Sequence, residues 1–332
     1  MGPTVRVVML GTGDFAVPTF QALADDRELQ VAALVTQPDR PQGRKQVLIS
    51  SRIKLDALAR GVPVLQPEDV NAAEGVAAIR ALAPDFLVTA AYGQILSAEL
   101  LGVPRVAAVN LHGSVLPAYR GAAPVARAIE RGETESGVTV IRMTPRIDAG
   151  GMLKIARTPI DADETAGALE DRLAALGAPL VVETLRELLA GGSEPIPQVR
   201  SRITKAPKLR KEDGLIDWSK PARVIHNLIR AMQPWPAAST SLDGNRGAEA
   251  EPLRVIIHKS EPVEAGDGHA QTPGAVIEAV GDRLVVAAGE GAVRLLNLQV
   301  AGKKPLSADE FVRGHAHLLL GHSFHNGGRS SV

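Results

Sequence analysis

The fold is decided by the stretch VRVVMLGTGDFA, residues 5–16. An apolar run, Val5–Leu10, ends at Gly11, and apolar residues at helical spacing follow over residues 14–26, with Asp14 predicted as the helix N-cap. A short buried strand, a glycine turn and a helix are typical of the first unit of a doubly wound α/β fold. The turn also matches G-x-G-x-x-A, which raises the hypothesis of a nicotinamide enzyme.

The alternation of strands and helices continues outward from this stretch. Further strands are predicted at residues 31–36, 62–65, 86–91, 106–111, 137–143 and 152–157, and helices at 51–60, 71–82, 124–131 and 166–189. Short apolar strands between helices indicate a sheet that is covered on both faces. The sequence therefore predicts an α/β fold, a Rossmann-like, doubly wound and mostly parallel sheet, for residues 1–190.

The second half of the chain has a different pattern. A glycine-rich stretch and then a basic one indicate a linker over residues 191–211. Short strands with glycine turns follow, which predict a small C-terminal β-barrel over residues 212–313. The remainder, residues 314–332, contains four histidines among glycines and is predicted to be a flexible tail.

Composition excludes several classes of protein. Lys plus Arg and Asp plus Glu both number 37, so a wholly basic nucleic-acid binder is excluded while local basic patches are not. The absence of cysteine excludes disulfides, cysteine nucleophiles and cysteine-bound zinc. No apolar run approaches the roughly 20 residues of a membrane span, and we read no signal peptide. We expect a cytoplasmic protein with no membrane partner.

The dinucleotide hypothesis makes a further demand on the sequence. An acidic residue should follow the glycines by about 20 residues, at the end of the second strand, to bind the ribose. That strand ends at Thr36, and the nearest acid, Asp39, lies in a proline-flanked loop, although Arg40 or Arg44 could bind a 2′-phosphate. The NADP interpretation is weakened but not eliminated, and the alternative is a purely structural strand-to-helix turn.

The residues that could carry chemistry lie at the end of a later strand. Asn110 and His112 are two positions apart and so share one face of that strand, with Leu111 on the other. In an open parallel sheet the carboxyl ends of the strands border the ligand crevice. Asp148 ends another strand in a glycine-closed loop, where it could orient a protonated His112. Together they could stabilise an oxyanion and move a proton, although each alone is more often structural.

These residues lie in motifs that resemble those of the methionyl-tRNA formyltransferases, within the folate-dependent formyltransferase family. The similarity covers nearly the whole chain. The segments that carry it are GTGDF (11–15), TQPDRPQGR (36–44), AYG (91–93), NLHGSVLPAYRGAAP (110–124), ETESGVTVIRM (133–143), IDAGGML (147–153), IDWS (216–219), PWP (234–236) and LLNLQVAGKKPLSADEF (295–311).

The resemblance implies a formyltransferase domain that binds 10-formyltetrahydrofolate and a C-terminal barrel resembling an OB fold. It implies transfer of the formyl group to the α-amine of methionyl initiator tRNA, for translation initiation. The sequence itself calls for no metal, and we expect a monomer. Asn110, His112 and Asp148 would be catalytic. The folate would be bordered by Ser114, Val115, Leu116 and Pro117.

Basic side chains supply candidate contacts to the tRNA phosphates. The loop at residues 37–48 would reach the acceptor end of the tRNA, and the linker and the barrel would add a phosphate track. The candidates are Arg40, Arg44, Lys45, Arg202, Lys205, Lys208, Arg210, Lys211, Lys303 and Lys304. Aromatic residues make up only 3% of the chain, so base stacking is not expected to dominate.

The sequence departs from the family pattern at four positions. Gly13 replaces a usual proline, Val115 a leucine, Ala118 a basic residue and Gly151 an aspartate. Three alternatives stay open: a formyltransferase of the same architecture acting on an amino-sugar nucleotide or glycinamide ribonucleotide, an NADP-dependent oxidoreductase, and a non-catalytic tRNA-binding protein. The 36–41 loop and the basic linker favour the tRNA enzyme.

Overall fold

The computed structural model describes residues 4–42, 47–243, 252–264, 272–319 and 321–326. The chain forms two compact units. The first comprises Met1–Pro124, Glu135–Pro159 and Leu169–Pro207, and the second comprises Val125–Thr134, Ile160–Ala168 and Lys208–Val332. Within the described part of the chain, no helix is both long and apolar enough to cross a membrane.

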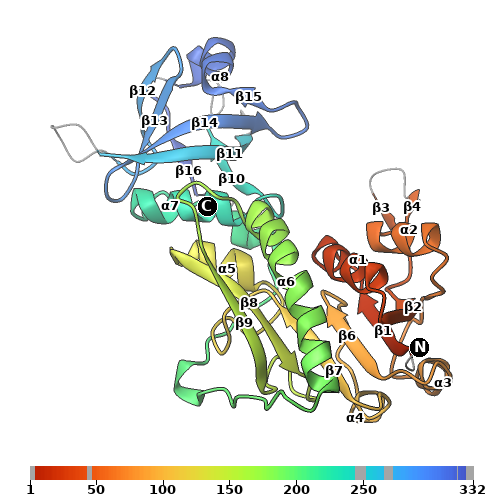
Figure 1. The fold of residues 1–332 in the computed structure, drawn as a ribbon. Helices are drawn as coiled ribbons and strands as arrows, with labels where there is room; N and C mark the ends of the chain where they lie inside the picture. The colour runs from red at the N-terminus through yellow and green to blue at the C-terminus, as the bar shows by residue number, and fades with distance from the viewer. Residues whose placement is uncertain (1–3, 43–46, 244–251, 265–271, 320, 327–332) are drawn as a thin grey trace. The chain divides into compact units, whose positions relative to one another are not determined.

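The first unit contains a seven-stranded sheet and the helices around it (Figure 1). Its elements, with η for short 3-10 helices, are β1 (Val5–Gly11), η1 (Asp14–Ala16), α1 (Val17–Asp25), β2 (Leu29–Val35), β3 (Arg40–Gln42), β4 (Val47–Ile49), α2 (Arg52–Ala59), β5 (Val64–Leu65), α3 (Ala73–Ala81), β6 (Phe86–Ala90), α4 (Ala98–Leu101), β7 (Ala107–His112), β8 (Glu135–Arg142), β9 (Met152–Pro159), α6 (Ala166–Leu189) and η2 (Arg200–Arg202).

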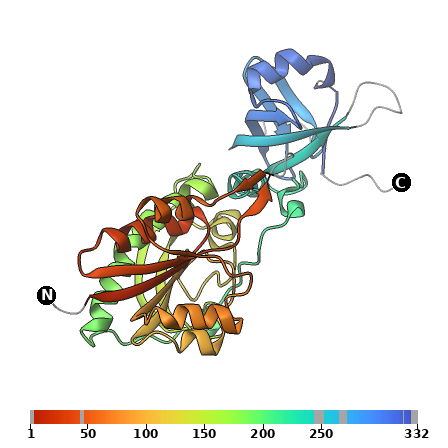
Figure 2. The same ribbon diagram turned by 90° about the vertical axis from the view of Figure 1, so that its right-hand side faces the viewer.

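The sheet has the strand order β5-β2-β1-β6-β7-β8-β9. The five strands from β5 to β7 run parallel, while β8 and β9 add an antiparallel extension beside β7. The parallel strands are apolar on both faces because helices cover both. Figure 2 shows the helices of residues 73–101 on the opposite side of this sheet from the long helix α6. The predicted Rossmann-like, mostly parallel sheet is confirmed.

The glycine turn after β1 differs in one respect from the prediction. The chain first forms η1, whose N-cap is Gly13 without any side-chain hydrogen bond, and α1 begins only at Val17. The prediction that Asp14 caps the helix is therefore wrong. A proline in the first turn of α1 removes one amide that would need a cap, which explains why no capping side chain is present.

Two segments expected to be irregular have regular structure. In the 37–48 loop, β3 and β4 pair as an antiparallel hairpin, Arg40 opposite Ile49. The expected linker over residues 191–211 is also partly ordered. Its residue Ile196 pairs with Met152 of β9 through two backbone hydrogen bonds of 2.8 Å. Lys205 pairs with Arg120, so this segment is part of the first unit.

The second unit is built on an antiparallel sheet. Its elements are α5 (Pro124–Glu130), η3 (Lys211–Gly214), α7 (Ala222–Ala231), β10 (Ala238–Leu242), β11 (Leu253–Val263), β12 (Val276–Val280), β13 (Arg283–Ala287), β14 (Ala292–Val300), β15 (Leu306–Ser307), α8 (Ala308–His315), η4 (Ala316–Leu318) and β16 (Phe324–His325). The strand order is β12-β13-β14-β11-β10-β16. The register of β11 shifts between Ile257 and Ser260, which curls the sheet.

The curled sheet closes on itself through the end of the chain. Phe324 of β16 donates its N–H to the Gly274 carbonyl at 2.8 Å, just before β12 begins. The Phe324 side chain is 1% exposed and lies 5.8 Å from the Trp218 ring. The predicted small barrel is confirmed. It also includes residues 316–318 and 324–325, which the sequence predicts as part of a flexible tail over residues 314–332. A buried aromatic residue holds them there.

Candidate active site

The candidate site lies where β7 ends, between the parallel strand β6 and the antiparallel strand β8. Asn110 is opposite Ile141 and His112 is opposite Thr139 in the β7–β8 register. Leu111 points to the other face, where its side chain fills the space beside Gly177 of α6. The alternation along β7 therefore places Asn110 and His112 together on the face away from α6.

Both ring nitrogens of His112 face oxygen atoms. Nε2 lies 2.9 Å from the Tyr119 carbonyl oxygen, and Nδ1 lies 3.6 Å from Oδ2 of Asp148. A carbonyl can only accept, so Nε2 carries a hydrogen and donates to Tyr119. Nδ1 is then the nitrogen whose protonation can change. The structure thus brings His112 and Asp148 together.

The Asp148 carboxylate is held by a backbone amide. Its Oδ2 accepts a hydrogen bond from the Gly121 N–H at 2.9 Å, and its side chain is 14% exposed. Gly121 has φ +127°, and a Cβ there would lie 2.4 Å from the Ala206 carbonyl oxygen, so this position requires glycine. The backbone therefore fixes the carboxylate that faces the imidazole.

The amide of Asn110 is oriented by the neighbouring strand. The Thr89 hydroxyl of β6 donates to Asn110 Oδ1 at 2.7 Å. Because Oδ1 accepts this bond, the Nδ2 group points away from Thr89, and in the described residues it has no hydrogen-bond partner. Asn110 is half-buried, so an oriented hydrogen-bond donor is present on the same face as His112.

The loop from Ser114 to Pro117 is braced from within. Thr139 of β8 donates its hydroxyl to the Ser114 carbonyl at 2.7 Å and accepts from the Leu116 N–H at 3.0 Å. The Ser114 hydroxyl donates to the Ala118 carbonyl at 2.7 Å, and Leu116 is buried in a cluster with Ile141 and Met152. Ser114 and Leu116 therefore use their side chains inside the protein. Those of Val115 and Pro117 are half-buried.

Sequence reasoning missed four residues that shape this site. They are Thr89, Tyr119, Gly121 and Thr139, and Tyr119 and Gly121 contact the site residues through backbone groups. Tyr119 and Gly121 lie in the quoted motif, but their carbonyl and amide roles leave no side-chain signal. Thr139 had a signal: a hydroxyl between Val138 and Val140 in the apolar middle of its strand, in register with His112.

The glycine turn at the end of β1 does not have free amides. The N–H groups of Thr12 and Gly13 both point to the Ala91 carbonyl oxygen, at 3.2 and 3.3 Å. A dinucleotide fingerprint needs the turn's backbone to approach a pyrophosphate. Gly11 is required for packing, since a Cβ there would lie 2.7 Å from that of Ala16. The turn therefore serves the fold.

Comparison with known proteins decides the family. Residues 5–185 match the model of the formyl transferase family, and residues 208–316 match that of the formyl transferase C-terminal domain. The methionyl-tRNA formyltransferase of Geobacillus thermodenitrificans is 44% identical over 310 residues, which cover 93% of this chain and 94% of the relative. That of Pelobacter propionicus is 46% identical over 308 residues, covering 93% and 92%. The chain belongs to the methionyl-tRNA formyltransferase family.

Solved structures agree with this fold. The sugar 3N-formyl transferase WlaRD has a TM-score of 0.65 at 19% identity, covering 91% of this chain and 100% of its own. HypX of Aquifex aeolicus, in complex with tetrahydrofolic acid, has a TM-score of 0.60 at 17% identity, covering 93% and 47%. Family membership and the occupied amides of the glycine turn together decide against the oxidoreductase and non-catalytic alternatives.

The departures from the family pattern have local consequences. Gly13 has open space, with Ala91 Cβ at 3.5 Å from a built Cβ, so glycine is not required there. At Gly151 a Cβ would lie 2.4 Å from Pro195 Cβ, so an aspartate does not fit this backbone. Ala118 contributes its carbonyl, which accepts the Ser114 hydroxyl.

The basic residues predicted to contact tRNA are distributed over both units. Arg40 on β3 is exposed and forms an ion pair of 2.8 Å with Glu68. Arg44 and Lys45 lie outside the described residues. Arg202 and Lys205 are exposed on the first unit. Those exposed on the second unit are Lys208, Arg210, Lys211, Lys303 and Lys304.

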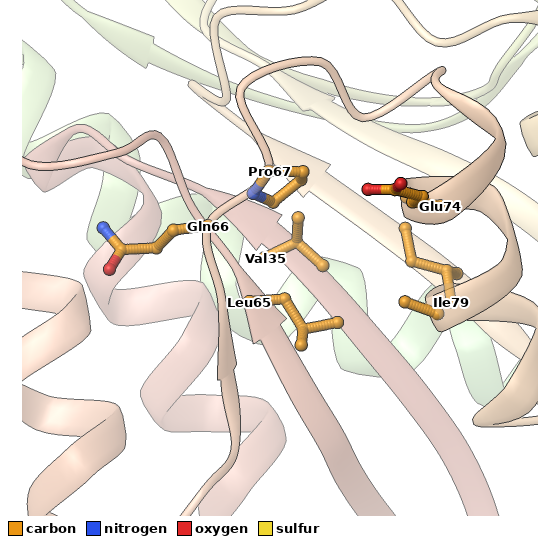
Figure 3. A pocket seen from close by; sticks show the side chains of 8 residues that line it. Val35, Leu65, Gln66, Pro67, Glu74 and Ile79 are labelled. Atoms are coloured by element: carbon orange, nitrogen blue, oxygen red, sulfur yellow. The ribbon is translucent and has the colours of Figure 1, made fainter.

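A separate pocket of about 180 Å³ lies at the ends of β2 and β5, beside α3 (Figure 3). Val35, Leu65 and Ile79 line it, while the Gln66 side chain points away and donates to the Gln37 carbonyl at 2.9 Å. The lining contains none of the predicted site residues. Across the described ranges, no group of three or more metal-ligating side chains comes together.

Proposed function

We propose that this chain transfers the formyl group of 10-formyltetrahydrofolate to the α-amine of methionyl initiator tRNA, for translation initiation. The observation that carries the proposal is the convergence at the end of β7. Asn110 and His112 lie on one face of that strand, the Asn110 amide is oriented by Thr89, and the Asp148 carboxylate lies beside the imidazole. The chain is 44% and 46% identical in sequence to two methionyl-tRNA formyltransferases over nearly their full length, which supports tRNA as the acceptor.

Formyl transfer needs a hydrogen-bond donor to the formyl oxygen and a route for one proton from the attacking amine to N10. The neutral α-amine attacks the formyl carbon, and negative charge develops on the formyl oxygen. Asn110 Nδ2 donates a hydrogen bond to that oxygen, and protonated Nδ1 of His112 adds a second donor. Loss of one such donor costs about 10²–10³ in rate. The bond from the carbon to N10 then breaks, and the attacking nitrogen's proton ends on N10.

Asp148 assists this proton movement through His112. Its carboxylate lies 3.6 Å from Nδ1 of His112 and stabilises the imidazolium form. Nε2 of His112 is occupied because it donates to the Tyr119 carbonyl. His112 therefore acts through Nδ1, and the two ring nitrogens cannot exchange roles. General acid–base assistance of this kind contributes about 10²–10⁴ in rate.

The folate is bordered by residues 114–117. Since Ser114 and Leu116 use their side chains inside the protein, they contribute backbone groups and a rigid shape. Val115 and Pro117, which are half-buried, supply the apolar contact. This division explains why an uncommon valine at 115 is tolerated.

The tRNA is bound through its phosphates by the exposed basic residues of both units. Lys303 and Lys304 follow β14 in a turn, and Lys208, Arg210 and Lys211 begin the second unit. The enzyme acts as a cytoplasmic monomer, which sedimentation of the purified protein with and without tRNA checks. Binding weakens steeply as salt rises.

A formylation assay tests the proposal. The protein is incubated with 10-formyltetrahydrofolate and methionyl-tRNA, with an amino-sugar nucleotide and glycinamide ribonucleotide as parallel acceptors and the Asp148→Asn variant as the control. Formylmethionine on the tRNA is the expected product. Formylation of either other acceptor, with none on the tRNA, would contradict the assignment.

A further inference from the structure

Residues 196–206, named here the strap, run along the candidate site of the first unit. The strap pairs with β9 at Ile196 and with Arg120 at its other end. Arg120 donates its N–H to the Thr204 carbonyl at 2.9 Å and accepts from the Ala206 N–H at 2.7 Å. Backbone hydrogen bonds therefore hold the strap at one end to β9 and at the other end to the loop that follows β7.

Gln198 of the strap holds the loop that carries Asp148. Its Nε2 donates to the Asp148 carbonyl at 2.8 Å and to the Gly150 carbonyl at 2.7 Å. Its Oε1 accepts from Arg120 Nε at 3.0 Å and from Arg120 Nη2 at 2.7 Å. One amide thus joins the backbone of the Asp148 loop to the guanidinium of Arg120, and both of its amide hydrogens are used.

Thr204 holds the other partner of the imidazole. Its hydroxyl oxygen accepts a hydrogen bond of 2.8 Å from the Tyr119 N–H. Tyr119 is the residue whose carbonyl accepts from His112 Nε2. The strap therefore contacts both residues that face the two ring nitrogens of His112.

The two residues that face the His112 ring have strained backbones. Tyr119 has φ +62° and Asp148 has φ +48°, in the left-handed region that side chains with a Cβ disfavour. Such conformations persist only where the surroundings hold them. Gln198 and Thr204 supply hydrogen bonds at these two positions.

We propose that the strap is a positioning element of the catalytic site, in which Gln198 and Thr204 set the Asp148 carboxylate and the Tyr119 carbonyl around the His112 ring. The reaction it serves rests on the proposed function, whereas the positioning itself concerns only the first unit. The strap has little apolar packing at Ile196 and Val199, whose residues are 60% and 52% exposed. Gln198 and Thr204 contact the site loops through hydrogen bonds, while Ala206 is buried at the end of the strap.

Matched variants separate positioning from packing. Gln198→Leu removes all four hydrogen bonds, and Gln198→Glu keeps an acceptor for Arg120 but has no hydrogen to donate to the two carbonyls. Thr204→Val removes the acceptor for the Tyr119 N–H at nearly the same volume, and Thr204→Ser keeps it. Val199→Ala, on an exposed side chain of the same segment, is the control.

Two readouts are measured on the full chain. The first is kcat and KM for 10-formyltetrahydrofolate with methionyl-tRNA. The second is the titration of the His112 ring, followed by nitrogen NMR with the resonance assigned through a His112→Gln variant. A misplacement of about 1 Å costs about 10²-fold in rate, so kcat should fall about 10- to 100-fold in Gln198→Leu, Gln198→Glu and Thr204→Val. KM should change less than about threefold, and the His112 titration should shift, because the groups facing both ring nitrogens move.

The conservative variants decide the outcome. Thr204→Ser and Val199→Ala should retain wild-type kcat and the wild-type titration. Wild-type kcat and an unchanged titration in Gln198→Glu and Thr204→Val would overturn the proposal. If the wild-type protein fails to formylate methionyl-tRNA, the proposed function is contradicted, while the His112 titration still decides the strap's role.

Discussion

Two strands of the same sheet end at glycine-containing segments, a short turn after β1 and a longer loop after β7, and only the second carries the candidate chemistry. β1 and β7 both run parallel to β6, so their carboxyl ends lie at one edge. After β1, the turn's amides point to the Ala91 carbonyl. After β7, Asn110 Nδ2 has no hydrogen-bond partner among the described residues, and His112 Nδ1 lies 3.6 Å from Asp148 Oδ2, too far for a hydrogen bond.

The comparison shows what a glycine pattern can and cannot report. Gly11 and Gly13 satisfy a cofactor fingerprint, yet the first is needed for packing and the second is not needed at all. A glycine pattern predicts backbone geometry, which many functions share. Polar side chains that share one face at the end of a strand, beside a fixed carboxylate, predict chemistry more directly.

The largest expected effect comes from the carboxylate beside β7. Asp148→Asn keeps the shape and an acceptor for the Gly121 N–H but removes the charge that faces Nδ1 of His112. We expect kcat for formyl transfer to fall by about 10²–10⁴. Circular dichroism melting should stay within a few degrees of wild type, and turnover close to wild type would remove Asp148 from the mechanism.

Loss of the amide donor should have a somewhat smaller effect. Asn110→Ala removes the Nδ2 group that Thr89 orients. We expect a loss of about 10²–10³ in kcat with little change in KM, because the donor acts on charge that develops in the transition state. Stopped-time assays at saturating folate measure it. A rise in KM at constant kcat would assign Asn110 to substrate binding instead.

The β1 turn should respond in stability rather than in turnover. Gly11→Ala places a Cβ 2.7 Å from Ala16 Cβ, which should lower the free energy of unfolding by about 1–3 kcal/mol. Gly13→Ala is the matched control: its φ of −73° suits alanine, so we expect no loss or a gain of about 0.4–1 kcal/mol. Urea melts measure both. Equal destabilisation by the two substitutions would remove the distinction between these glycines.

The smallest effect should come from the exposed basic residues, which have no part in the strand-end chemistry. Lys303→Ala with Lys304→Ala should reduce the slope of log affinity for tRNA against log salt by about one for each phosphate that a lysine no longer neutralises. Folate binding should not change. Filter binding over a salt series measures the slope, and an unchanged slope would place these lysines away from the phosphates.

The sequence could predict the sheet and the side-chain trio because both follow local rules. Alternating strands and helices determine the layers, and positions 110 and 112 share a face by strand geometry alone. The contact of Asp148 with His112 depends on a backbone turn at Gly121, which the sequence shows only as a glycine. Its place at the end of a strand made Asp148 a candidate partner of His112, and the resemblance added the expectation that both are catalytic.

Other features depend on contacts that composition hides. The ring nitrogen through which His112 works is set by a carbonyl of Tyr119, and any residue has a carbonyl. Gln198 and Thr204 lie in a basic, proline-containing stretch that is typical of a linker, so their long-range hydrogen bonds leave no pattern. Phe324 was a visible signal: a lone aromatic residue in a glycine- and histidine-rich end, buried against Trp218.

The central claim, that Asn110, His112 and Asp148 act as one unit in the transfer of the formyl group, is tested most directly by the double variant Asn110→Ala with Asp148→Asn. Its kcat for formylation of methionyl-tRNA is compared with that of each single variant. Residues that act as a unit give non-additive losses, so the account predicts a double variant about as slow as the slower single one. A loss equal to the product of the two single losses would contradict it.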